Sequence, residues 1–167
     1  MSAIDKLLEA NTDYASNFNQ GQLQMAPIRK MVIVTCMDSR LSMAMLGLKT
    51  GDAHILRNAG GIVTDDVLRS LIISHHLVGT ENFVVINHTD CGMLTFKDDD
   101  LRARLEQKTG AKSASPARFY SFSSLEENVR QQVQKVKSHP WLPNTITVRG
   151  FVYDVRTGRL KEVSAQQ

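Results

Sequence analysis

The feature that most constrains the fold is a set of short, apolar, β-branched runs separated by helical patterns. Residues 31–35 read Met-Val-Ile-Val-Thr, and residues 83–86 read Phe-Val-Val-Ile. Continuous apolar runs of this length are typical of buried strands in a parallel sheet. Further strands are predicted at 53–57 and at 145–153, with a turn at 154–158 after the last of them.

Helical patterns lie between these strands. A helix is predicted to begin at Thr64 or Asp65 and to end before Gly79, because apolar residues recur at helical spacing between these caps. Two more helices are predicted, near 98–108 and 123–138. Strands that alternate with helices predict an α/β fold: a central, mostly parallel β-sheet flanked by helices on both faces.

An N-terminal arm is predicted to precede the core. Residues 2–18 fit a short amphipathic helix, and a connection that contains Pro27 follows them. A chain of 167 residues falls within the usual range for one domain. We therefore expect a single domain that consists of a helical arm over 1–28 and a core over 29–167.

Composition excludes several classes of function. The net charge is +3, but the 20 basic residues are spread among 17 acidic ones, so no basic cluster indicates a nucleic-acid partner. No apolar run is long enough to span a membrane, and the N-terminus does not resemble a secretory signal. We expect a cytoplasmic protein whose two cysteines are reduced and free for metal or redox chemistry.

Three potential metal ligands fall at the carboxyl ends of predicted parallel strands. Cys36 directly follows the first strand, and His88 and Cys91 follow the strand at 83–86. This edge of an open α/β sheet is where sites form. Two thiolates and one imidazole suit Zn²⁺, and three protein ligands leave one position open, as in catalytic zinc sites. Taken singly, each residue could instead be an ordinary buried side chain at a strand end.

Polar residues beside these ligands allow further roles. Asp38 and Arg40 can turn towards each other, and an arginine holds a carboxylate in a bidentate geometry; an ordinary surface ion pair is the alternative. Asp90 fits either an acceptor behind the ligands or a cap of its own turn. His54, His75 and His76 are proton-shuttle candidates by residue type only, and because two of them lie in a predicted helix a solvated or core role is preferred.

These motifs together resemble the beta class of carbonic anhydrases in residue type, order and spacing. The matching segments are Cys36-Met-Asp38-Ser-Arg40, Arg57-Asn58-Ala59-Gly60 and His88-Thr-Asp-Cys91-Gly92. The resemblance implies one Zn²⁺ per subunit on Cys36, His88 and Cys91, with Asp38 and Arg40 as a catalytic dyad. It also implies a homodimer or homotetramer in which the N-terminal helix packs on the neighbouring subunit.

The implied chemistry is the reversible hydration of CO2 to bicarbonate. Zinc supplies hydroxide near neutral pH, and this nucleophile can add to the carbon of CO2. Because two thiolates cancel the charge of the metal, we expect turnover to rise towards alkaline pH. Arg40 is expected to hold Asp38 away from the metal, so that replacing Arg40 with Ala inactivates the enzyme but leaves zinc bound.

The expected substrate pocket, formed by Ala59, Gly60 and His54, differs from that of plant-like members. His54 stands where an aromatic residue is expected, and Ala59 where a larger Val is common. Some members hydrolyse carbonyl sulfide or carbon disulfide with the same zinc chemistry, and a pocket widened at Ala59 could admit sulfur. Carbonyl sulfide hydrolysis is therefore kept as an alternative, and a non-catalytic zinc or redox-sensing protein as a third interpretation.

Overall fold

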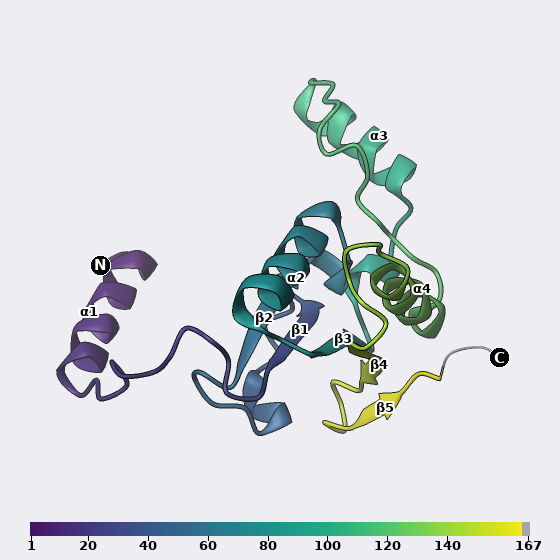
Figure 1. Ribbon diagram of the computed structural model, residues 1–167. Coiled ribbons are helices and arrows are strands. Elements are labelled where there is room, and N and C mark those ends of the chain that lie inside the picture. Colours follow the sequence, from purple (N-terminus) through teal and green to yellow (C-terminus); the bar gives the residue numbers. More distant parts are fainter. Residues whose placement is uncertain (165–167) are drawn as a thin grey trace.

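The computed structural model describes residues 1–164 and contains one five-stranded sheet (Figure 1). The strand order is β2-β1-β3-β4-β5, and β1 to β4 are parallel whereas β5 is antiparallel to β4. The strands are β1 (Met31–Cys36), β2 (Ala53–Asn58), β3 (Asn82–His88), β4 (Thr147–Tyr153) and β5 (Leu160–Glu162). The predicted mostly parallel α/β fold is confirmed, although the last three residues of the predicted core, 165–167, lie outside the described residues.

All the predicted helices are present. They are α1 (Ala3–Ser16), α2 (Asp65–Val78), α3 (Asp98–Thr109) and α4 (Leu125–Lys137), with short 3-10 turns η1 (Met43–Leu46), η2 (Ala59–Gly61) and η3 (Gly92–Leu94). The Thr64 side chain accepts a hydrogen bond from the backbone of Val67 and caps α2. Gly79 ends α2 in the left-handed conformation, at a φ of 77°. These caps explain why the bounds of α2 could be read from the sequence.

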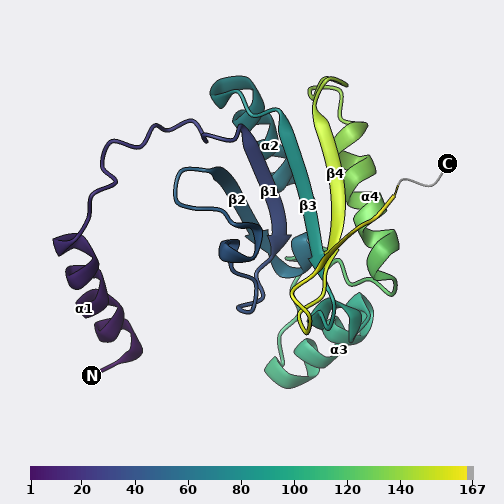
Figure 2. The ribbon, with the colours of Figure 1, turned by 90° about the horizontal axis from the view of Figure 1, so that it is seen from below.

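Helices α2 and α4 pack on the same face of the sheet (Figure 2). Their apolar residues join one cluster with alternate residues of the strands, among them Val34, Val85 and Val148. On β4, Gly150 leaves room for Val129 of α4, whose side chain would overlap any Cβ at that position. The expectation that helices cover both faces is therefore wrong for the elements of this chain. Sequence periodicity identifies an apolar helix face but does not say which side of the sheet it covers.

The opposite face carries an apolar groove instead of a long helix. Its lining includes Ile33 of β1, Leu46 of η1 and Phe151 of β4, and its volume is about 290 Å³. Neither cysteine lines this groove. Strand β5 borders this groove through Leu160. The sequence analysis predicted the turn before β5 but not β5 itself. Three exposed residues are too few to show a periodic pattern.

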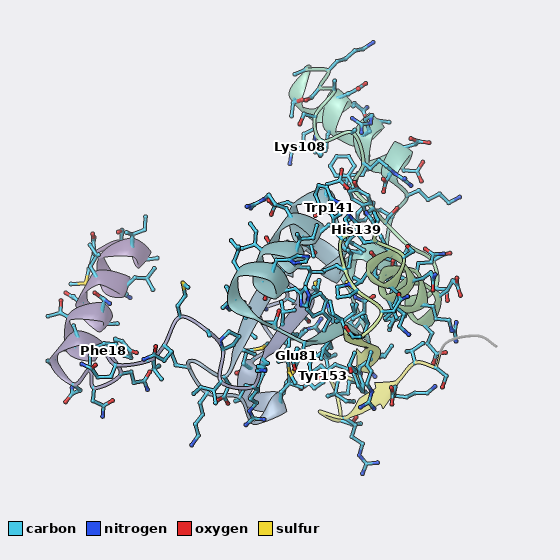
Figure 3. All side chains as sticks on the ribbon, viewed as in Figure 1. Phe18, Glu81, Lys108, His139, Trp141 and Tyr153 are labelled. Carbon is cyan, nitrogen blue, oxygen red and sulfur yellow. The ribbon has the colours of Figure 1, made fainter. Side chains whose placement is uncertain are left out.

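Two helices make little contact with the sheet. No residue of α1 is buried, and α1 stands apart from the sheet in both ribbon views (Figures 1 and 2). Phe18 lies just after the C-terminal end of this helix (Figure 3). Helix α3 also has no buried residue and projects from the edge of the sheet where the parallel strands end (Figure 2). Among the described residues, no helix is both long and apolar enough to cross a membrane.

Candidate metal centre

The three predicted ligands meet at the carboxyl edge of the sheet. Cys36 and His88 are the last residues of β1 and β3, which extend one and two residues beyond the ends of the predicted strands. Cys91 directly precedes η3. Since β1 and β3 are adjacent and parallel, with Thr35 opposite Ile86, their ends lie side by side. The two sulfur atoms and one ring nitrogen lie within 4.8 Å of one another, and all three residues are buried. This group could hold a metal ion.

The His88 ring is prepared to act as a ligand. Its Nδ1 lies 2.9 Å from the carbonyl oxygen of Thr89. Because a carbonyl only accepts, Nδ1 carries the proton, and Nε2 therefore presents a lone pair. Nε2 is buried and has no hydrogen-bond partner within residues 1–164. A buried polar atom without a partner is costly, and a metal ion bound by Nε2 would remove that cost.

The two thiols form a strongly unequal pair. The neighbouring Cys91 thiol lowers the pKa of Cys36, against the opposing effect of burial. Ionised Cys36 in turn raises the pKa of Cys91, and burial raises it further. One thiolate therefore forms readily, whereas a second anion at the same place requires a cation to compensate it. Two cysteines and one histidine as donors favour zinc among the common metals.

Asp38 lies at the edge of this cluster and is held by Arg40. Arg40 donates from Nε to Oδ1 at 2.9 Å and from Nη2 to Oδ2 at 2.8 Å, and its backbone N–H donates to Oδ1 at 2.9 Å. These bonds hold the pKa of Asp38 far below its usual range, although burial opposes them. Asp38 Oδ2 lies 3.8 Å from Nε2 of His88. An ionised hydrogen-bond acceptor therefore faces the ligand group, which an ordinary surface ion pair would not do.

Two further residues position this pair. Asp90, in the left-handed region at a φ of 56°, accepts from Arg40 Nη1 through its carboxylate at 2.7 Å and from Nη2 through its carbonyl at 3.0 Å. Of its two predicted roles, the structure supports an acceptor behind the ligands. Arg57 donates to the carbonyl oxygens of Cys36 at 3.0 Å and Asp38 at 2.6 Å. This function of Arg57 was not predicted from the sequence.

The glycine turn after β2 also reaches the cluster. The backbone N–H of Gly60 donates to the sulfur of Cys36 at 3.3 Å, and the preceding Ala59 is exposed. Gly60 and Gly61 have φ values of 83° and 63°, which favour glycine. A Cβ on Gly61 would lie 3.0 Å from the backbone of Thr35. The turn therefore brings backbone against backbone at Gly61, in a space that a side chain would fill.

Three histidines lie away from the cluster. His54 is paired with Val32 near the start of β2, and its Nδ1 lies 2.8 Å from the hydroxyl of Ser74. Asn58, at the other end of β2, lies four residue steps from His54, about 13 Å. The structure thus does not bring His54 to the metal ligands of its own chain. His75 and His76 lie in the last turn of α2 and contact backbone carbonyls there.

Apolar side chains surround the cysteines. Buried Met93 and Leu41 form a cluster with Cys36 and Cys91, and partly buried residues pack against it. These are Met45, Leu94, Phe96, Phe122, Tyr153 and Val155. Phe122 is anchored there by its backbone N–H, which donates to the carbonyl oxygen of Met93 at 3.2 Å. Apolar walls of this kind exclude water from a reacting group and suit a small uncharged substrate.

The fold and this cluster define an α/β protein that carries, at the carboxyl edge of its sheet, a Cys-His-Cys group able to hold a metal ion. Residues 31–160 match the family model described as carbonic anhydrase. Beta-carbonic anhydrase 1 of Mycobacterium tuberculosis is 46% identical over 166 residues, which cover 98% of this chain and 99% of the relative. The chain belongs to the beta-carbonic anhydrase family and is an enzyme of that family, so the non-catalytic interpretation is set aside.

Other relatives show the range of the family. A solved carbonic anhydrase from Streptococcus mutans superposes with a TM-score of 0.92 at 44% identity, covering 98% of this chain and 99% of that one. A carbon disulfide hydrolase of Acidithiobacillus thiooxidans is 32% identical over 152 residues, covering 80% of this chain and 76% of the relative. Family membership alone therefore leaves the choice between oxygen and sulfur substrates to be argued.

Proposed function

We propose that this protein is a zinc-dependent carbonic anhydrase that catalyses the reversible hydration of CO2 to bicarbonate. The observation that carries the proposal is the unpartnered Nε2 of buried His88, within 4.8 Å of two cysteine sulfurs and beside the Asp38–Arg40 pair. Cys36, His88 and Cys91 would hold one zinc ion per subunit. When bound there, zinc lowers the pKa of water and so supplies hydroxide near neutral pH.

The role of Asp38 follows from its hydrogen bonds. Because Arg40 keeps the carboxylate ionised, Asp38 accepts a hydrogen bond but donates none. It can therefore accept a hydrogen bond from the attacking hydroxide, which would direct a lone pair of that oxygen towards the carbon of CO2. Arg40 also keeps both oxygens of Asp38 engaged, which opposes their use as metal ligands. Asp38 and Arg40 are thus proposed as the catalytic dyad.

Carbonyl sulfide hydrolysis, to CO2 and H2S, is the second candidate. Two observations favour it: the small side chain of Ala59 beside Gly60, and the apolar residues Met93 and Phe122, which would meet a Cβ on Gly60 at 3.0 and 3.2 Å. An apolar wall of this kind could accept sulfur in place of oxygen. CO2 remains the first choice, because the relative named a carbonic anhydrase is 46% identical and the relative named a carbon disulfide hydrolase is 32% identical.

The discriminating experiment compares both reactions on one zinc-loaded preparation at about pH 8.5, where hydroxide supply is favoured. The rate of CO2 hydration is measured by stopped flow, and sulfide release from carbonyl sulfide is measured in parallel. Fast hydration with only trace sulfide release is the expected result. The reverse ratio would move the assignment to a carbonyl sulfide hydrolase.

An assembly is proposed as well, in which the arm over 1–28 leaves its own core, 29–167, and packs on a second copy in a homodimer or homotetramer. Its support is the exposure of the apolar residues Ile4, Leu7 and Leu8 on α1, between 65% and 69%. Isolated helices of this length are marginal in water, so such a helix is expected to find a packing surface. A cytoplasmic location is proposed because the thiols must stay reduced to bind metal.

A further inference from the structure

Three buried side-chain amides form a continuous chain of hydrogen bonds behind the metal centre. The backbone N–H of Val63 donates to Gln132 Oε1 at 2.9 Å, and Gln132 Nε2 donates to Asn128 Oδ1 at 2.9 Å. Asn128 Nδ2 then donates to Asn87 Oδ1 at 2.7 Å, and Asn87 Nδ2 donates to the carbonyl oxygen of Gly60 at 2.9 Å. The three amides are at most 7% exposed. We call Gln132, Asn128 and Asn87 the amide chain.

The two ends of the amide chain fix its direction. At one end the N–H of Val63 can only donate, so Gln132 must present its oxygen there. At the other end the carbonyl of Gly60 can only accept, so Asn87 must present its nitrogen. Asn128 in the middle is then left with one arrangement, in which it donates towards Asn87 and accepts from Gln132. No member of the chain can be reversed without placing two donors or two acceptors face to face.

The amide chain holds the turn that contacts a metal ligand. It grips this turn at Gly60 and Val63, while the side chain of Asn58 pairs with both backbone groups of Ile62 at 2.7 and 2.8 Å. Within the turn, the N–H of Gly60 donates to the sulfur of Cys36 at 3.3 Å. A glycine is flexible unless its neighbouring peptide groups are held. The bonds to Asn87 and Gln132 therefore restrict the direction of the Gly60 N–H.

Packing alone does not require amides at these places. The rest of the buried surface of α4 is formed by apolar residues, Val129 and Val136. Burying side-chain amides is unfavourable unless their polar atoms have hydrogen-bond partners. Each amide oxygen and nitrogen of the chain has such a partner, which indicates that the amides fix the geometry of the turn. Hydrogen bonds that hold a metal ligand commonly alter metal affinity by 10- to 100-fold.

We propose that Gln132, Asn128 and Asn87 are positioning residues of the metal centre, which keep the Gly60 N–H directed at the Cys36 sulfur. This hydrogen bond fixes the orientation of the sulfur and reduces the charge that it offers to the metal. Residues of α4 that touch neither metal nor substrate thereby control how tightly the metal is held. The inference rests on the proposed function only because it requires a metal at Cys36, and it does not depend on which substrate the enzyme uses.

The test replaces Asn128 with Asp, which keeps the size of the side chain but sets an oxygen against Oδ1 of Asn87. The matched control is Gln134→Glu, the same amide-to-carboxylate change at an exposed position of α4. Each protein is loaded with zinc or cobalt. Zinc affinity is measured by competition with a chelator, the thiolate-to-cobalt absorption band by spectroscopy, and hydrogen exchange of the Gly60 amide by NMR.

The expected result for Asn128→Asp is a loss of zinc affinity of roughly tenfold or more, a displaced cobalt band and faster exchange at Gly60 relative to core amides such as Val85. Gln134→Glu should match the wild type in all three. If Asn128→Asp does not fold, Gln132→Met breaks the chain at its other end with a side chain of similar length, and the same results are expected.

A lower thermal stability with unchanged zinc affinity, cobalt band and Gly60 exchange would overturn the proposal, because the amide chain would then be a structural element only. Failure of the proposed function is recognised separately. It would appear as zinc-loaded wild-type protein without CO2 hydration, whatever the variants do to metal binding.

Discussion

Replacing Arg40 with Ala tests the catalytic dyad most sharply. The guanidinium makes two bonds to the carboxylate of Asp38, at 2.8 and 2.9 Å, and two bonds to Asp90, at 2.7 and 3.0 Å. All four are lost in Arg40→Ala, whereas the three metal ligands are untouched. The carboxylate of Asp38 then keeps only the backbone N–H of residue 40 as a hydrogen-bond donor, so it is free to turn towards the ligand group.

The size of the effect on catalysis follows from the number of positioning bonds removed. Loss of one preorganised group that orients reacting atoms commonly reduces kcat by about 100-fold or more, and here both bonds that aim Asp38 disappear. We therefore expect CO2 hydration to fall by at least about 100-fold. The fold should survive, because the Arg40 side chain is 44% exposed and such ion pairs add little to stability.

The assay is stopped-flow CO2 hydration, with zinc content measured on the same samples. Arg69→Ala is the matched control, since Arg69 forms a comparable pair with Asp66 at 2.8 Å on the exposed side of α2. Arg40→Lys should recover only part of the activity, because lysine keeps the charge but not the two-pronged contact. Turnover of Arg40→Ala within about twofold of the wild type, at full zinc content, would refute this role of Arg40.

Three further predictions concern stability and metal dependence. Gly61→Ala should reduce the free energy of unfolding in urea by about 2 to 3 kcal/mol, because its Cβ would press on the backbone of Thr35. Gly79→Ala, with open space around its Cβ, should cost only about 1 kcal/mol, and equal losses would argue against the close approach. Three backbone N–H groups lower the pKa of Asp98 to about 2, against the opposing effect of burial. The stability that Asp98 adds is therefore complete above its ordinary pKa of 3.8 and is lost as pH falls towards 2. Asp98→Asn should thus reduce the free energy of unfolding by about 1 to 2 kcal/mol at pH 7 and by almost nothing near pH 2. A difference that does not depend on pH would contradict this. His88→Ala should abolish zinc binding by equilibrium dialysis and leave the far-ultraviolet circular dichroism unchanged, and full zinc retention would exclude His88 as a ligand.

The sheet and the ligand group could be predicted because local signals were strong and agreed with one another. The apolar runs that became β1 and β3 are unbroken, and parallel neighbouring strands bring their carboxyl ends together. Cys36 and His88 end those two strands, so their meeting followed from topology alone. Neither conclusion required knowledge of side-chain packing.

The amide chain could not be predicted, because its members are ordinary in sequence. Asn128 and Gln132 lie in a helix rich in Glu, Gln and Lys, where amides usually belong to the solvated face. Only the contact between α4 and β3 brings them to Asn87. The function of Arg57 could not be predicted for a similar reason, since a long and flexible side chain selects its partner in three dimensions.

His54 shows the opposite limit. Its position in the motif suggested a place in the substrate pocket, but pairing in the sheet fixes it near the start of β2, beside Ser74 of α2. A motif gives the order of residues along the chain, whereas the strand register decides which end of the sheet each one occupies. The place of His54 in the substrate pocket therefore remains a prediction, and the contacts within one chain do not support it.

The most direct test of the proposed function is a zinc titration of metal-free protein followed by CO2 hydration. The proposal predicts no turnover without metal, a linear rise with added zinc, and a plateau at one zinc per subunit. Turnover in the metal-free protein, or none at full zinc occupancy, would contradict the assignment of a zinc-dependent carbonic anhydrase.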